Sequence, residues 1–97
     1  MKLTSKAETA FKAYYVDQYQ EGVFRQYKWF KDLPESFKWG VYQDWADSLE
    51  YYFDIEKRFD EDGYVCFGNH NFEKETNTRQ EARNAAIEKL NQLINEG

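Results

Sequence analysis

A β-hairpin is predicted by residues 51–67, YYFDIEKRFDEDGYVCF. In the first half of this stretch apolar and polar residues alternate, which is the spacing of a strand with one apolar face. Residues 60–63, DEDG, form the turn, because Gly63 can adopt the positive φ that a tight hairpin requires. The second strand then starts at Tyr64 and continues toward Phe72.

The sequence leaves open which side chains of the second strand face the protein core. One register buries Tyr64 and Cys66, and the other buries Val65 and Phe67. A slip of one residue exchanges the two faces of a strand, and the length of the turn sets the register.

Two helices are expected before the hairpin. The first spans about residues 5–20 and starts with a capping box at residues 5–8, SKAE, whose serine and glutamate would bind free backbone donors. The second spans about residues 34–47, because Pro34 fits the first turn of a helix. Gly40 inside this helix costs about 1 kcal/mol relative to alanine, which favours a close contact with another element there.

A third helix follows the hairpin, and residues 78–81, TRQE, form a capping box at its start. Residues 23–31 fit a strand and a helix equally well. The order is therefore helix, helix, hairpin, helix. It predicts a single α+β domain over residues 1–97, in which an antiparallel hairpin or small sheet packs against the helices. The third helix carries an apolar stripe of Ala82, Ala86, Leu90 and Leu93.

Charge and composition exclude several classes of protein. The chain of 97 residues has 13 basic and 18 acidic residues and a net charge of −5, which argues against a nucleic-acid coat or a binder of anionic membranes. No apolar run approaches the roughly 18 residues of a membrane helix, and the N-terminal sequence lacks the apolar segment of a signal peptide. A single cysteine fits a reducing compartment. We therefore expect a cytoplasmic protein.

Aromatic residues dominate the apolar part of the composition, with 3 Trp, 8 Tyr and 8 Phe. Each aromatic side chain buries a large area, so a few of them replace many aliphatic residues in a core. Aromatic residues left on the surface would favour a partner interface, where Tyr and Trp are common hot spots.

Catalytic and metal-binding patterns are scarce, so we expect neither an enzyme nor a cofactor. Cys66 and His70 are four residues apart on the predicted strand, about 13 Å, which is too far for a Cys–His nucleophile pair. They are also too few for a structural zinc site. The acidic residues near the turn lack the spacing of a calcium loop, and the five glycines do not cluster as in a phosphate loop.

The first candidate binding feature is acidic. Seven carboxylates around the hairpin are expected to form one face that attracts a basic partner, such as the nucleic-acid channel of a nuclease. Ordinary solubility is the alternative explanation for them. These residues are Asp54, Glu56, Asp60, Glu61, Asp62, Glu73 and Glu75.

The second candidate feature is a basic and aromatic segment. Cations interleaved with stacking rings are what single-stranded nucleic acid requires. However, Asp32 and Glu35 lie in the same stretch, and its aromatic residues also suit a core. A nucleic-acid-binding accessory protein is therefore the alternative function. Its binding residues would be Arg25, Tyr27, Lys28, Trp29, Lys31 and Lys38, beside Phe30, Phe37 and Trp39.

Two stretches resemble small proteins of phages and prophages. They are residues 33–42, LPESFKWGVY, which continue to Asp44 and Ser48, and residues 78–89, TRQEARNAAIEK. The resemblance implies a non-enzymatic accessory protein that acts on host machinery. In size, acidity and lack of catalytic residues, the chain is most similar to anti-CRISPR proteins.

The most specific expectation from this resemblance is an inhibitor of an RNA-targeting, type VI CRISPR nuclease. The partner would be this host nuclease or its complex with guide RNA, in the host cytosol and without a membrane. Anti-CRISPR proteins share no common site motif, so the resemblance assigns no binding residues. A structural or regulatory phage protein, including a homo-oligomer, is a further alternative.

Overall fold

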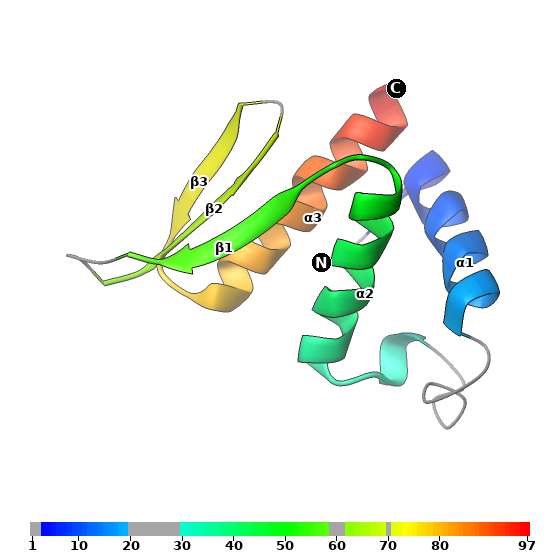
Figure 1. The fold of residues 1–97 in the computed structure, drawn as a ribbon, viewed down its shortest axis with the longest axis horizontal. Helices are drawn as coiled ribbons and strands as arrows, with labels where there is room; N and C mark the ends of the chain where they lie inside the picture. Colours follow the sequence, from blue (N-terminus) through cyan, green and yellow to red (C-terminus); the bar gives the residue numbers. More distant parts are fainter. Residues whose placement is uncertain (1–2, 20–29, 59–61, 70) are drawn as a thin grey trace.

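The computed structural model describes residues 3–19, 30–58, 62–69 and 71–97. In these ranges the chain forms three α-helices, a short 3-10 helix and a three-stranded antiparallel sheet, which confirms the α+β class and the order helix, helix, sheet, helix (Figure 1). The elements are α1 (Ser5–Tyr19), η2 (Phe30–Asp32), α2 (Glu35–Ser48), β1 (Phe53–Lys57), β2 (Tyr64–Gly68), β3 (Phe72–Thr76) and α3 (Arg79–Glu96).

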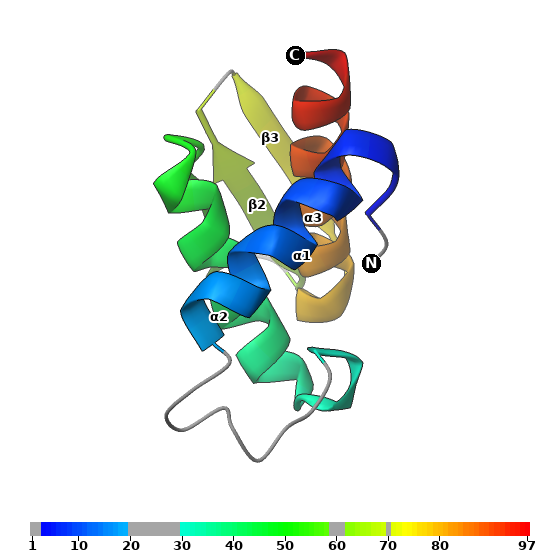
Figure 2. The same ribbon diagram turned by 90° about the vertical axis from the view of Figure 1, so that its right-hand side faces the viewer.

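The helices lie on one side of the sheet. The strand order is β1-β2-β3, and α3 packs against all three strands. Helix α1 contacts α2 and α3 instead, and Figure 2 shows it in front of them with the sheet behind. None of the described helices is long and apolar enough to cross a membrane.

The second strand is shorter than the sequence predicts. We expected it to continue toward Phe72, but β2 ends at Gly68 and the chain turns back into β3. The side chain of Asn69, directly after β2, is fixed to the segment before β1, because it accepts a hydrogen bond from the backbone N–H of Tyr52 (3.1 Å) and donates one to the carbonyl of Glu50 (2.9 Å). Asn71 adopts a φ of 58°, which asparagine tolerates better than most residues.

The register of β2 shows which of its side chains face the core, a choice that the sequence leaves open. Cys66 lies opposite Ile55 and is fully buried against the helices, so Val65 and Phe67 point to the other face of the sheet. At the turn before β2, the predicted positive φ of Gly63 is confirmed, since this angle is 115°.

Aromatic side chains fill much of the core. The ring of Phe11 on α1 lies 4.8 Å from the rings of both Phe30 and Tyr42 and 5.1 Å from that of Trp45, measured between centroids. This cluster joins α1, η2 and α2. Burial, together with the charge of Glu35, raises the pKa of Tyr42 to about 12, so its phenol stays neutral under ordinary conditions.

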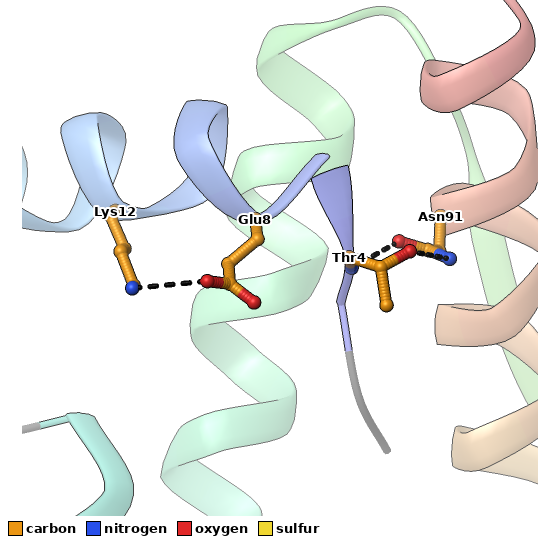
Figure 3. Close-up of polar contacts among 4 residues, drawn as sticks. All are labelled: Thr4, Glu8, Lys12 and Asn91. Atoms are coloured by element: carbon orange, nitrogen blue, oxygen red, sulfur yellow. Dashed lines mark hydrogen bonds and ion pairs between the residues drawn. The ribbon is translucent and has the colours of Figure 1, made fainter. Parts of the chain in front are cut away.

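The two predicted capping boxes have different outcomes. At α3 the N-cap half of the box forms, since Thr78 Oγ1 accepts a hydrogen bond from the backbone N–H of Glu81 at 3.1 Å. The Glu81 carboxylate accepts from the Thr78 hydroxyl at 3.2 Å, in place of the backbone N–H of Thr78 that a full capping box uses. At α1 the prediction for residues 5–8 is wrong. There the Glu8 carboxylate binds Lys12 at 3.1 Å (Figure 3).

Asparagines of α3 bind the start of α1 instead. The backbone N–H of Thr4 donates to Asn91 Oδ1 at 2.8 Å (Figure 3), and that of Ala7 donates to Asn95 Oδ1 at 2.9 Å. Because α3 lies beside this end of α1, it supplies the acceptors that the first turn of a helix needs. The two termini of the fold are therefore joined by side-chain to backbone hydrogen bonds.

Replacing Gly40 by alanine is expected to stabilise the protein by about 0.5–1 kcal/mol, because alanine loses less backbone entropy in a helix. The close contact expected from the sequence is absent, since a Cβ at this position would meet none of the described atoms within 4 Å. Urea unfolding followed by circular dichroism measures the change. A lower midpoint than that of the wild type would contradict the open space at Gly40.

Candidate functional site

The candidate site is the face of the sheet that points away from the helices. Directly paired residues of an antiparallel sheet share a face. Asp54, Phe67 and Glu73 lie side by side across β1, β2 and β3, and so do Glu56, Val65 and Glu75. We call these six residues the outer face. Its centre is apolar, on β2, and carboxylates lie on both sides of that centre.

None of the described helices covers the outer face, because α1, α2 and α3 all lie on the opposite side of the sheet (Figures 1 and 2). Glu56, Glu73 and Glu75 are exposed to solvent, while Val65 and Phe67 are half-buried among their neighbours. The apolar centre is thus accessible but shielded at its sides.

Tyr52, directly before the first residue of β1, extends the outer face at that end of the strand. Its side chain is 49% exposed, and its ring centroid lies 6.4 Å from that of Phe67. The phenol donates a hydrogen bond to Asp54 Oδ2 at 3.2 Å. Desolvation, the charge of Asp54 and this hydrogen bond raise the pKa of Tyr52, so the hydroxyl remains a donor at neutral pH.

The outer face keeps most of its negative charge. Arg58 Nη1 lies 2.7 Å from Glu75 Oε2, and this ion pair offsets one of the carboxylates. Among the described residues, Glu56 and Glu73 have no cation within ion-pair distance.

On the opposite face of the sheet, burial and the charge of Asp54 raise the pKa of the Cys66 thiol to about 11. This buried thiol is therefore protonated at neutral pH and a poor nucleophile.

The structure brings four of the seven predicted acidic residues together on the outer face: Asp54, Glu56, Glu73 and Glu75. Asp62 is exposed at the hairpin turn, just before β2. Asp60 and Glu61 lie outside the described residues. The apolar members Val65 and Phe67 were not predicted as site residues, since the sequence alone does not fix the register of β2.

The basic and aromatic segment is described only in part. Arg25, Tyr27, Lys28 and Trp29 lie outside the described residues. Lys31 is exposed on η2. Lys38 Nζ lies 3.5 Å from Glu35 Oε1, which offsets its charge, and Phe30 packs into the aromatic core. Phe37 is exposed and Trp39 is half-buried, so the described part of this segment has aromatic and basic side chains at the surface and stays the alternative site.

Metal ligands do not cluster in the part of the chain that the structure describes. No group of three or more His, Cys, Asp or Glu side chains there could hold a metal ion. His70, four positions after Cys66 in the sequence, lies outside the described residues. Cys66 itself is on β2, which ends two residues before that position.

Comparisons with protein-family models, with curated proteins and with solved structures find no match to this chain. The resemblance of residues 33–48 and 78–89 to small phage proteins therefore stays a prediction from sequence motifs.

Proposed function

We propose that this protein is a non-enzymatic binding protein whose outer face contacts a basic surface of a partner protein. The observation that supports this proposal is the composition of the outer face. Val65 and Phe67 form an accessible apolar centre, flanked on both neighbouring strands by carboxylates. An apolar centre with a polar rim is the usual anatomy of a protein interface.

The carboxylates determine what kind of partner this face suits. Asp54, Glu56 and Glu73 repel nucleic acid and attract a surface rich in lysine and arginine. A nuclease channel is such a surface, because it must bind phosphates. Tyr52, partly exposed beside Phe67, would be an anchor residue of the contact.

The more specific form of the proposal is an inhibitor of a host defence nuclease. Its support is the resemblance of residues 33–48 and 78–89 to phage proteins, together with the acidic outer face. The nuclease proposed is an RNA-targeting CRISPR effector, free or bound to its guide RNA, in the host cytosol. By occupying the basic channel, the protein would exclude the RNA target.

The test of this function has two stages. Tagged protein is incubated with a lysate of a bacterium that carries an RNA-targeting CRISPR system, with and without added ribonuclease, and bound proteins are identified by mass spectrometry. The effector is then purified and its RNA cleavage is measured with increasing amounts of the protein. We expect stoichiometric loss of cleavage. Unchanged cleavage would contradict the inhibitor. Recovery of RNA alone, lost with salt, would favour the nucleic-acid-binding alternative through residues 25–38.

Charge reversal on the outer face is expected to slow association with the captured partner. In the double variant Glu56→Lys, Glu73→Lys, the association rate constant should fall at least about tenfold at low ionic strength, because electrostatic steering contributes factors of this size. The salt dependence of the rate should also shrink. Surface plasmon resonance at several salt concentrations measures both quantities.

A matched control separates the effect of the outer face on the association rate from the effect of net charge. The double variant Asp17→Lys, Glu88→Lys alters exposed carboxylates on α1 and α3, and it changes the net charge of −5 by the same amount. This control should lose little of the association rate. Equal losses in both double variants would show that overall charge, and not the outer face, governs binding.

A further inference from the structure

A small cleft lies at the edge strand β1, between α2, β1 and α3, which are neighbours in Figure 1. Its volume is about 290 Å³, just below the range of about 300–1,000 Å³ for drug-sized ligands. The lining residues are Trp39 and Gln43 from α2, Asp54 and Ile55 from β1, and Arg79 and Arg83 from α3.

Among the described residues, no carboxylate lies within ion-pair distance of the two arginines of the cleft. Arg79 and Arg83 are one helical turn apart on α3, so their side chains lie on the same side of the helix. The Nε atom of Arg83 is buried and has no hydrogen-bond acceptor among the described residues. The guanidinium carbon of Arg79 lies 5.3 Å from the ring centroid of Tyr64, a contact that holds the cation without neutralising it.

The one carboxylate in the lining is already occupied by other donors. Asp54 Oδ1 accepts a hydrogen bond from the backbone N–H of Ile55 at 2.8 Å, and Oδ2 accepts one from the Tyr52 hydroxyl at 3.2 Å. The hydrogen bonds that Asp54 accepts therefore come from Tyr52 and Ile55 and not from the arginines. It reduces the positive charge of the lining, which favours a ligand group with a single negative charge.

The remaining side chains suit the rest of such a ligand. Gln43 Nε2 donates to the carbonyl of Phe53 at 3.3 Å, which fixes the amide beside the arginines. The half-buried Trp39 also lines the cleft. Burial of an arginine N–H without an acceptor is unfavourable, and arginine binds the oxygens of carboxylates and phosphates in a fork geometry.

We propose that Arg79 and Arg83 form a binding site for an oxyanion, a carboxylate or phosphate group with one negative charge. This site differs from the outer face in charge, because it uses cations where the outer face uses carboxylates, and the two share Asp54. It requires no catalytic step.

The test uses the full chain labelled with ¹⁵N and the side-chain Nε–H resonances of its arginines. Sodium acetate and sodium phosphate are titrated separately at constant ionic strength, with sodium chloride as the reference. We expect saturable shifts of the Arg79 and Arg83 resonances, in acetate if the ligand group is a carboxylate and in phosphate if it is a phosphate. Shifts that do not saturate, or that appear equally at all arginines, would overturn the site.

Variants locate the binding. Arg83→Gln should lower the affinity for the anion at least about tenfold, as expected for loss of a charge-assisted hydrogen bond. Arg79→Gln provides a second variant if the first does not fold. The matched control is Arg58→Gln, whose arginine pairs with Glu75 on the outer face, and it should leave the affinity unchanged. Equal affinities in all three variants would also overturn the proposal.

Discussion

The variant Trp45→Ala is expected to lose about 3–5 kcal/mol of the free energy of unfolding, the usual effect of truncating a buried tryptophan. Trp45 is only 1% exposed and is the largest fully buried side chain among the described residues. Its ring lies 5.1 Å from that of Phe11, so it joins α2 to α1. Native proteins have a total stability of about 5–15 kcal/mol, so this loss is a large fraction of it.

Urea unfolding followed by far-UV circular dichroism measures this loss. The control is Trp39→Ala, since Trp39 is half-buried at the edge of the cleft and should contribute less. A loss below about 1 kcal/mol for Trp45→Ala would be too small for a buried ring and would contradict its place in the core.

The variant Gly68→Ala is expected to be destabilised by about 3 kcal/mol, at the upper end of the range for inserting a group into a packed site. A Cβ at this position would overlap the carbonyl oxygen of Tyr52 and lie 3.0 Å from Phe53 Cδ1. The first of these atoms belongs to the backbone, so β1 and β2 would have to separate at this end. The same measurement on Gly40→Ala should give the opposite sign, since that site is open.

Thermal and urea unfolding of these two glycine variants together distinguish local packing from a general effect of alanine. If Gly68→Ala were as stable as the wild type, the close approach of β2 to Tyr52 would be wrong. In that event the register between Phe53 and Gly68 would also need revision.

The order of the elements could be predicted because it depends on local signals. The capping box at Thr78, the proline at position 34 and the turn glycine at position 63 each mark a boundary through the conformation of a few neighbouring residues. The start of α1 could not be predicted in the same way. Its acceptors come from Asn91 and Asn95, more than 80 positions away in the sequence.

The candidate site was predictable only in part for the same reason. The acidic residues Glu56 and Glu73 attract notice in the sequence, but their position on one face depends on a third strand. That strand follows Asn69 and Asn71, two residues whose type tolerates turn conformations and so indicates the end of β2. The arginine cleft arises from three elements packed together, so no single stretch of sequence indicates it.

The outer face is the proposed binding surface for the partner protein. Cross-saturation NMR tests this assignment most directly, with the protein labelled with ²H and ¹⁵N and the purified partner unlabelled. We predict that saturation transferred from the partner reduces the amide signals of β1, β2 and β3 most strongly, with Glu56, Phe67 and Glu73 at the centre. The largest reductions on α1 or α2, with the strands unaffected, would contradict the claim.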